Sequence, residues 1–394
     1  MNDNLKKSDI LVIGGGPSGM MAAYQAKLTF PEKRVIIVER NSEVGTKLML
    51  SGNGRCNVSV RVSNEALIQA ANGHGKFLYS TLQQFNPETL IHFFESHGCP
   101  LKEEDHHRLF PQSDRAADIR KVLLDCLDEA GVLLETGVCI EHLDAEQRIA
   151  YSSKTAYHFN HLIVATGGRS FPQTGSDGLG YQLLASVGLT VTELWPVESP
   201  LVSQHPLIQS KVLQGIALKD VELRVLGQKK TVLKHDLLFT HFGLSGPVAL
   251  QASFSVQQAL RIQKSVPIQL DFLPEVAEEE LQYYLIHHTL DQLAKMYRLP
   301  KRLLAVLSAE PGNWGDRLKR FRMEVSDVRG FNTAFVTAGG VALNQIDPKT
   351  MKAKQFPWLS VCGEALDLNS WTGGYNLTMA FSSGYSAGVH CLAE

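Results

Sequence analysis

The sequence lacks the features that would favour a secreted, membrane-bound or metal-binding protein. Its six cysteines are scattered over 394 residues, with no C-x-x-C pair and no zinc-like spacing. We therefore expect reduced thiols in a cytosolic protein, no metal site, and no flavin–dithiol relay. Residues 1–9 lack the apolar segment of a signal peptide, and the apolar run Ile10–Ile13 is too short to cross a bilayer. A cytoplasmic location without a membrane partner is the resulting expectation.

The sequence also has no excess of charge of either sign. It contains 38 Lys and Arg against 40 Asp and Glu, a formal net charge of -2. This balance gives no reason to expect nucleic acid or an anionic membrane as a partner, so a small molecule is the expected substrate. The oligomeric state is left open. The chain is long enough for two or three domains with cores of their own.

The first motif is a glycine-rich turn between a buried strand and a helix. Asp9–Ile13 predicts a buried parallel strand, and Gly14–Gly19 matches G-x-G-x-x-G. A helix is expected over Met20–Leu28 and a second strand over Arg34–Val38, followed by Glu39, whose carboxylate could accept from ribose hydroxyls. A glycine-rich loop without a ligand is the alternative. The complete order of strand, turn, helix, strand and acid favours a dinucleotide site.

Each glycine of this turn has an expected role. Gly14 makes the tight turn, Gly16 lets a pyrophosphate approach the backbone, and Gly19 lets helix and strand pack closely. Pro17 and Ser18 lie within this turn, and the free N–H groups of the helix that follows would face the phosphates. An acid at the end of the second strand fits an unphosphorylated adenosine ribose, as in FAD or NAD.

Further segments favour FAD. Gly45–Leu48 and Ser51–Asn57 are rich in glycine, and their Lys47 and Arg55 could supply positive charge to a pyrophosphate or a flavin ring. A surface loop is the alternative interpretation. The apolar run His161–Val164 predicts a strand that ends in Ala165-Thr166-Gly167-Gly168, where small residues let the chain return close to the pyrophosphate. A strand is also expected within Gly131–Ile140.

The last such segment is C-terminal. Trp358–Cys362 predicts a strand ending in Gly363 and Glu364. Gly373–Tyr375 then leads to a helix expected to start at Asn376. The N–H groups and dipole of that helix would stabilise the negative charge that builds on a flavin during reduction.

Together these motifs resemble one family, the bacterial FAD-dependent flavoproteins that include aminoacetone oxidase-like proteins and NAD(P)/FAD-dependent oxidoreductases similar to a bile-acid reductase. The resemblance covers nearly the whole chain. Its carrying segments are Gly45–Leu48, Ser51–Asn57, Glu104–Pro111, Ala165–Gly168, Leu238–Pro247, Gly339–Val341 and Gly363–Asn376.

The resemblance implies an α/β fold, in which a Rossmann-like FAD-binding domain with a doubly wound sheet is interrupted by a small β-barrel-like domain that carries a helical insert. The expected limits are 1–190 and 346–394 for the FAD-binding domain, 191–272 and 326–345 for the barrel-like domain, and 273–325 for the insert. Strand-like pieces over 199–272 and a helical pattern over 274–321 support this division.

The motifs and the resemblance also give the expected contacts of a non-covalent FAD. Cys56 is expected to be a small packing residue there. The expected cofactor-binding residues are Gly14, Gly16, Pro17, Ser18, Gly19, Glu39, Arg40, Lys47, Leu48, Ser51, Gly54, Arg55, Cys56, Asn57, Val138, Ala165, Thr166, Gly167, Gly168, Gly363, Glu364, Asp367, Gly374, Tyr375 and Asn376.

A second G-x-G-x-x-G after an apolar strand, which is typical of an NAD(P)H domain, is not found. Gly175–Gly180 is rich in glycine, but no strand precedes it, and a turn that opens a helix over Tyr181–Val187 is the favoured interpretation. NAD(P)H, if it is used, would bind transiently at the flavin face. This favours an oxidase without excluding a reductase.

Three side chains are candidates for catalysis. His241, in a turn with Ser245 before an apolar helix, could help to bind an anion or a carbonyl, although a capped turn explains it equally well. Arg108 could hold a carboxylate, although a surface ion pair is the favoured alternative. Tyr375 could stack on or hydrogen-bond near the flavin, and packing at a domain boundary is its alternative.

The sequence leaves three alternative functions open. The first is an FAD-dependent oxidase of small amines that passes electrons to oxygen; aminoacetone as its substrate rests on the resemblance alone. The second is an NAD(P)H-dependent reductase of an enone-like or other small acceptor. The third is a non-catalytic flavin-binding redox sensor or partner of another macromolecule, and the near-neutral charge argues against RNA as that partner.

Overall fold

The computed structural model describes residues 5–228 and 232–393. The chain divides into two compact units: unit 1 runs to Trp195 and resumes at Val336, and unit 2 runs from Pro196 to Phe335. The chain leaves unit 1 through β10 (Trp195–Val197) and returns through β18 (Val336–Ala338). Each unit has its own hydrophobic core. The finer three-part division expected from the sequence stays a prediction.

Parallel strands form the centre of unit 1. Every residue of β2 is buried, as are Ile10–Ile13 of β1, which is the continuous burial that a sheet covered on both faces requires. The neighbours β20, β9, β1, β2 and β6 all pair in parallel in that order, and β19 pairs antiparallel with β20. The strands are β1 (Leu5–Ile13), β2 (Val35–Glu39), β6 (Leu133–Thr136), β7 (Ile140–Asp144), β8 (Ile149–Ser152), β9 (Ala156–Val164), β19 (Lys352–Ala353) and β20 (Phe356–Val361).

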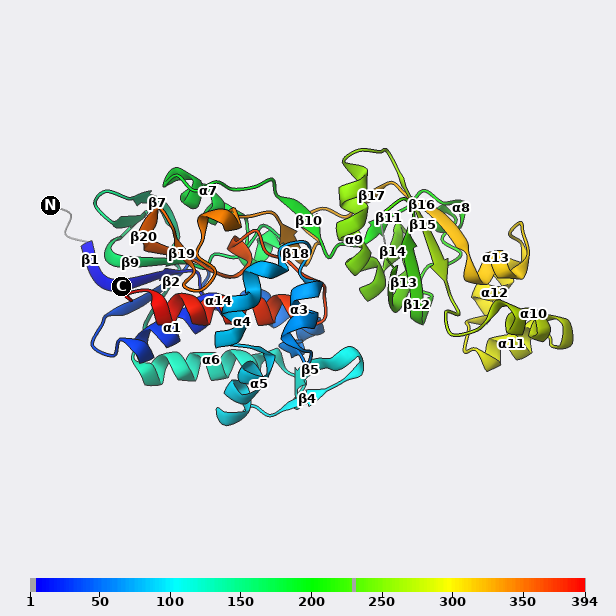
Figure 1. Ribbon diagram of the computed structural model, residues 1–394, viewed down its shortest axis with the longest axis horizontal. Helices are drawn as coiled ribbons and strands as arrows, with labels where there is room; N and C mark the ends of the chain where they lie inside the picture. Colours follow the sequence, from blue (N-terminus) through cyan, green and yellow to red (C-terminus); the bar gives the residue numbers. More distant parts are fainter. Residues whose placement is uncertain (1–4, 229–231, 394) are drawn as a thin grey trace. The chain divides into compact units, whose positions relative to one another are not determined.

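Two helices from opposite ends of the chain, α1 and α14, pack backbone against backbone (Figure 1). A Cβ on Gly384 or Gly388 of α14 would lie 2.3 Å from the carbonyl oxygen of Ser18 or Ala22 of α1, so this contact requires glycine. The helices of unit 1 are α1 (Pro17–Thr29), α2 (Thr46–Leu50), α3 (Asn64–Ala70), α4 (Leu78–Gln84), α5 (Pro87–Ser96), α6 (Ala116–Ala130), α7 (Leu179–Ser186) and α14 (Tyr375–His390).

The strand expected over Gly131–Ile140 is interrupted in the structure. β6 ends at Thr136, Gly137 adopts a left-handed φ of 71°, and β7 begins at Ile140. The Gly137 N–H instead donates to the carbonyl of Asn41, just beyond β2, and the Val138 N–H donates to that of Glu39, the last residue of β2. The break therefore brings Val138 to the end of β2. A small three-stranded sheet completes unit 1, and its strands are β3 (Ser59–Val60), β4 (Leu101–Glu103) and β5 (Arg108–Pro111).

Unit 2 is built on a sheet that curls until its ends meet. In the strand order β16-β15-β12-β13-β14-β11-β17, the outermost strands β16 and β17 are joined in the chain by Ser326 alone. The helices α10 to α13 form the insert between β15 and β16 (Figure 1). The elements are β11 (Leu201–Val202), α8 (Pro206–Gln209), β12 (Ala217–Val225), β13 (Val232–Phe239), β14 (Gly243–Ser245), α9 (Pro247–Leu260), β15 (Val266–Asp271), α10 (Glu278–His287), α11 (Leu290–Met296), α12 (Lys301–Ser308), α13 (Trp314–Lys319), β16 (Phe321–Val325) and β17 (Asp327–Val328).

Within residues 5–228 and 232–393, no helix combines the length and the apolar character needed to span a bilayer.

Candidate functional site

A cavity in unit 1 lies where β1, β2 and β9 end. It contains about 820 Å³ of empty space, part of it open to solvent, and Gly14, Gly16, Glu39 and Thr166 are among its lining residues. Open α/β sheets bind their ligands at the carboxyl ends of the strands. The cavity is therefore the candidate site.

The expected cofactor-binding residues fall inside and outside this cavity. Those that line it are Gly14, Gly16, Pro17, Glu39, Arg40, Lys47, Leu48, Val138, Ala165, Thr166 and Gly167. Those outside the lining are Ser18, Gly19, Ser51, Gly54, Arg55, Cys56, Asn57, Gly168, Gly363, Glu364, Asp367, Gly374, Tyr375 and Asn376. Lining residues that were not expected include Asn41, Cys139 and the whole segment Thr174–Gly180.

The glycines of the β1–α1 turn have different surroundings. A Cβ on Gly14, whose φ is 106°, would lie 2.5 Å from the Ala165 carbonyl oxygen, and one on Gly19 would lie 1.9 Å from that of Gly14. A Cβ on Gly16 would meet nothing within 4 Å. Gly14 and Gly19 are therefore needed for packing, whereas Gly16 leaves free space in the cavity at the start of α1. That free backbone position fits a bound pyrophosphate.

Glu39 is held in place by the backbone. Its Oε2 accepts the Gly15 N–H at 2.7 Å and its Oε1 accepts the Asn41 N–H at 2.9 Å. Because each carboxylate oxygen can accept a second hydrogen bond, ribose hydroxyls can still be bound. Thr166 adds a buried Oγ1 with no hydrogen-bond partner in the part of the chain that the structure describes. A polar ligand atom would relieve the cost of that unpartnered hydroxyl. The residues present thus fit FAD.

Lys47 and Glu364 join the cavity to the C-terminal motif. The Lys47 Nζ lies 2.8 Å from Glu364 Oε2, and Glu364 Oε1 accepts the Thr337 N–H at 2.8 Å. Gly363 packs behind the β1–α1 turn, since a Cβ there would lie 2.4 Å from the Ser18 Oγ. Gly363 therefore packs against the cavity wall, and Glu364 orients the Lys47 side chain.

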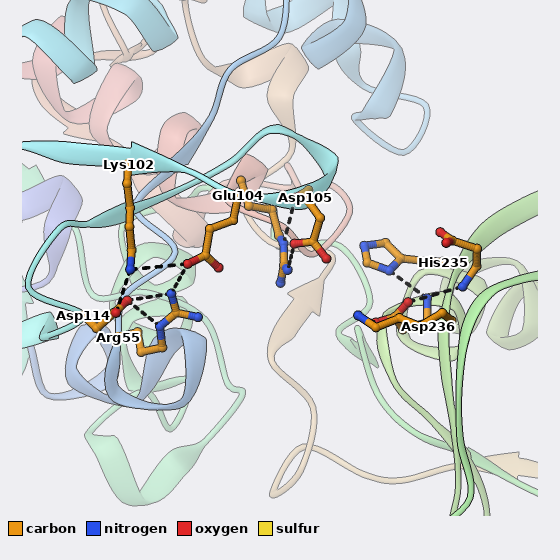
Figure 2. A network of polar contacts seen from close by, with 10 residues as sticks. Arg55, Lys102, Glu104, Asp105, Asp114, His235 and Asp236 are labelled. Atoms are coloured by element: carbon orange, nitrogen blue, oxygen red, sulfur yellow. Dashed lines mark hydrogen bonds and ion pairs between the residues drawn. The ribbon is translucent and has the colours of Figure 1, made fainter. Parts of the chain in front are cut away.

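A second group of expected residues surrounds the buried Phe110 ring. The Arg55 guanidinium lies 4.1 Å and that of Arg108 5.5 Å from the ring centroid. Figure 2 shows Arg55 between Glu104 and Asp114, with a 2.7 Å hydrogen bond from its Nε to Asp114. The hydrogen bond from Arg55 lowers the pKa of the Glu104 carboxyl. The positive charge of Arg55 is thus shared with two carboxylates.

Lys102 completes this network. Its Nζ lies 2.6 Å from Asp114 and 3.5 Å from Glu104 (Figure 2). Hydrogen bonds from Lys102 and Arg55 lower the pKa of the Asp114 carboxyl. Two cations and two carboxylates therefore balance locally.

Two of the three catalytic candidates are neighbours at the start of α14. A Cβ on Gly373 would lie 3.8 Å from Cε2 of Tyr375 and 4.0 Å from Cγ of Arg108. Arg108 forms an ion pair with Asp105, and burial raises the pKa of the Tyr375 hydroxyl. The third candidate, His241, lies exposed in unit 2, with its ring edge-on to Phe242.

Some expected ligand residues have structural partners. The Asn376 amide donates to the Ser370 and Trp371 carbonyls at 2.9 and 3.0 Å and accepts the Ser370 N–H at 2.9 Å. The helix begins at Tyr375, one residue before the expected start, because Gly374 with a φ of 101° forms its N-cap. The Asn376 side chain therefore braces the preceding loop.

The Ser51–Asn57 segment and Asp367 are also tied into the chain. Asp367 accepts from the Thr192 hydroxyl at 3.0 Å, and Ser51 donates to the Leu48 carbonyl at 2.7 Å. Cys56 is fully buried, and burial raises its thiol pKa to about 12, so it is an inert packing residue. Asn57 leaves its Oδ1 buried without a hydrogen-bond partner among the described residues.

Comparison with known families shows where the chain belongs. The family model described as "HI0933-like protein Rossmann domain" matches residues 8–390. The chain belongs to this family. The resemblance and the fold class inferred from the sequence are thereby confirmed, and the chain is an FAD-dependent oxidoreductase of the HI0933-like family. Among the described residues, no group of three or more His, Cys, Asp or Glu side chains could hold a metal ion.

Two kinds of curated relative align over almost the whole chain. A 3-dehydro-bile acid delta(4,6)-reductase of Clostridium scindens is 30% identical, over 96% of this chain and 97% of the relative. A ribosomal RNA dihydrouridine synthase of Escherichia coli is 27% identical, over 99% of both. Among solved structures, a 3-ketosteroid-delta4-(5alpha)-dehydrogenase from Rhodococcus jostii RHA1 aligns with a TM-score of 0.55 at 15% identity, over 99% of this chain and 97% of that one. At this identity the structure shows a shared fold alone.

Proposed function

We propose that this HI0933-like protein uses FAD to reduce a carbon–carbon double bond conjugated to a carbonyl group. The observation that carries the proposal is that Arg108 and Tyr375 both lie close to Gly373, at the N-terminus of α14. This pair offers a cation and a proton donor next to a helix N-terminus, which are the groups that such a reduction needs.

The names of the relatives support the same reaction type. A delta(4,6)-reductase of a 3-dehydro-bile acid adds hydrogen to double bonds of an oxo compound, and dihydrouridine has two hydrogens more than uridine. Both names therefore describe reduction of a carbon–carbon bond. Neither describes oxidation of an amine, so the oxidase expected from the sequence becomes the competing proposal.

In the proposed reaction the carbon β to the carbonyl would accept the hydride that FAD, when bound and reduced, would supply. Tyr375, whose hydroxyl is protonated at neutral pH, donates its proton to the α carbon. Arg108, oriented by Asp105, and the free N–H groups of α14 stabilise the negative charge on the carbonyl oxygen. Solvent reprotonates Tyr375, and NAD(P)H is the proposed source of electrons.

We further propose a small molecule as the substrate. Unit 1, which contains both the cavity and the Arg108–Tyr375 pair, has 21 Lys and Arg against 26 Asp and Glu, a net charge of -5. An acidic unit is a poor surface for a polyanion such as RNA. His241, in the other unit, has no role in this proposal.

The test is an anaerobic titration of the FAD-loaded protein, followed in the visible flavin band. We expect NADH or NADPH to bleach the flavin and 2-cyclohexenone or 4-androstene-3,17-dione to restore it. Tyr375→Phe should slow the restoring step about 10²-fold and leave bleaching unchanged. Tyr385→Phe, on the same helix but stacked on Phe85, is the matched control.

Other outcomes would contradict the proposal. Bleaching by aminoacetone, with reoxidation by air and release of peroxide, would establish the amine oxidase. If a uridine-containing RNA restored the flavin absorbance and neither enone did, the reaction type would stand but the small-molecule substrate would be wrong. A flavin that no donor reduces would favour the redox sensor.

A further inference from the structure

The segment 172–178 follows no strand, yet it forms one wall of the cofactor cavity. Its residues Thr174–Gly178 line the cavity together with Gly14 and Gly16 of the β1–α1 turn. The segment leads into α7, as the sequence predicts, but the glycine pattern gave no indication that it would face the first glycine-rich turn. We call residues 172–178 the strap.

The strap is fastened to the two residues that follow Glu39. The Arg40 Nη1 lies 2.6 Å from Asp177 Oδ2 and donates to the Gly175 carbonyl at 3.3 Å. The Asn41 Nδ2 donates to the Thr174 carbonyl at 2.9 Å. The strap is therefore held by side chains from the end of β2, the strand that carries the expected ribose ligand.

The contacts that hold the strap are weak enough to break. The Arg40 and Asp177 side chains are 37% and 40% exposed, and exposed ion pairs hold only weakly. Gly175 and Gly178 have φ values of 92° and 91°, so the backbone of the strap turns at each of these two glycines. On its inner side the strap has one buried attachment, the 3.0 Å hydrogen bond from Ser176 Oγ to the Gly168 carbonyl.

We propose that the strap is a clasp for the cofactor: Arg40 and Asn41 hold it closed at the Glu39 end of the cavity, and it opens to let FAD enter and leave. Retention of FAD then depends on Asp177 and Ser176 in addition to the residues of the glycine-rich turn. This inference rests on FAD binding and is independent of the reaction proposed above.

The closed clasp has a kinetic consequence that distinguishes it from an ordinary contact. A residue that only contacts FAD changes the dissociation rate and leaves the association rate alone. A fastening of a clasp slows both rates, because FAD has to pass the strap in both directions. Weakening the fastening should therefore speed both entry and exit.

Asp177→Asn is the principal variant. It removes the charge that pairs with Arg40 and keeps a side-chain oxygen for the Leu179 N–H, which Asp177 accepts at 3.1 Å. Ser176→Ala loosens the inner attachment, and it provides a second variant should the first fail to fold. Asp118→Asn is the matched control, since it removes the charge of an ion pair with Arg115 at the start of α6, away from the cavity lining.

The measurement is the fluorescence of FAD after rapid mixing with apoprotein, and after dilution of the FAD-loaded protein. For Asp177→Asn and Ser176→Ala we expect both rate constants to rise about fivefold, with the dissociation constant changed less than about twofold. Asp118→Asn should match the unchanged protein. High salt should speed both rates of the unchanged protein and have less effect on Asp177→Asn.

Two results would overturn the clasp. Rates of both strap variants equal to those of Asp118→Asn would show that the strap does not limit exchange. A faster dissociation with an unchanged association rate would show that Asp177 is an ordinary contact of FAD. Because no substrate is present, neither result depends on the outcome of the enone test.

Discussion

Two glycine-rich segments line the same cavity for different physical reasons. Gly14–Gly19 follows the buried strand β1 and opens α1, whereas Gly175–Gly180 follows an irregular stretch and opens α7. In the first segment, Gly14 and Gly19 are needed because a Cβ would collide with backbone oxygens. In the second, Gly175 and Gly178 have positive φ values, and a Cβ on Gly175 would meet a side chain, with Asn41 Nδ2 at 2.6 Å, instead of a backbone oxygen.

The comparison teaches that glycine spacing alone does not identify the role of a loop. The first segment is fixed from both sides by packing of a strand and a helix. The second is held by polar side chains at the end of β2, chiefly Arg40 and Asn41. A packed turn keeps one conformation whether or not a ligand is bound, whereas a segment held by exposed polar contacts can move.

The largest effect is expected from Gly19→Ala. Helix propensity would favour alanine by about 1 kcal/mol, but the Cβ would lie 1.9 Å from the Gly14 carbonyl oxygen. Relieving that clash forces the helix away from the strand, so we expect the free energy of unfolding to fall by at least about 2 kcal/mol. Urea unfolding of the apoprotein measures this. If Gly19→Ala left the stability unchanged, the first segment would not be fixed by packing, and the contrast with the second segment would be wrong.

Gly16→Ala should separate binding from folding within the same turn. Its Cβ would meet nothing within 4 Å, and Gly16 already has an extended φ of -79°, so the stability of the apoprotein should stay within about 0.5 kcal/mol. The added methyl group would occupy cavity space, and we expect FAD to bind about tenfold more weakly. A fluorescence titration tests this, and wild-type affinity would argue against a pyrophosphate at Gly16.

The smallest effect concerns pH. Burial alone would raise the pKa of Asp177, but the hydrogen bond and charge of Arg40, together with backbone hydrogen bonds that include the Leu179 N–H, lower the pKa. A carboxyl with a lowered pKa in the folded state stabilises above its unfolded pKa of about 3.9 and loses that contribution as the pH falls through its folded value. FAD dissociation should therefore be constant from pH 8 to pH 5 and become faster only below about pH 4. Acceleration already near pH 6 would mean that a different group holds the strap.

The sequence predicted the part of the site that depends on local order along the chain. Gly14, Gly16 and Glu39 line the cavity because a buried strand, a tight turn and a helix follow one another directly. The same reasoning missed Asn41 and Thr174–Gly178, since their placement depends on side chains that meet across more than 130 residues of sequence. It also did not anticipate that Arg55 and Lys47 are paired with carboxylates.

Pairs of distant residues explain the remaining differences. Arg108 and Tyr375 were separate candidates with separate alternatives. Their proximity at Gly373 arises because β5, which carries Arg108, pairs with β3, and β3 lies against the start of α14. The interruption at Gly137 was hidden because strand-forming apolar residues lie on both sides of it. Only the positive φ of that glycine and the hydrogen bonds to Asn41 and Glu39 break the strand.

The sequence by itself determined the Rossmann-like fold and the glycine-rich turn, because these follow from hydrophobic periodicity and from turn residues whose requirements are local. It indicated the family through the resemblance of its motifs. The tertiary structure alone decided that the second glycine-rich segment closes the cavity and that Arg108 and Tyr375 are neighbours. Such contacts join residues far apart in the chain, and their geometry is set by how helices and strands pack, to which single positions in the sequence give no direct clue.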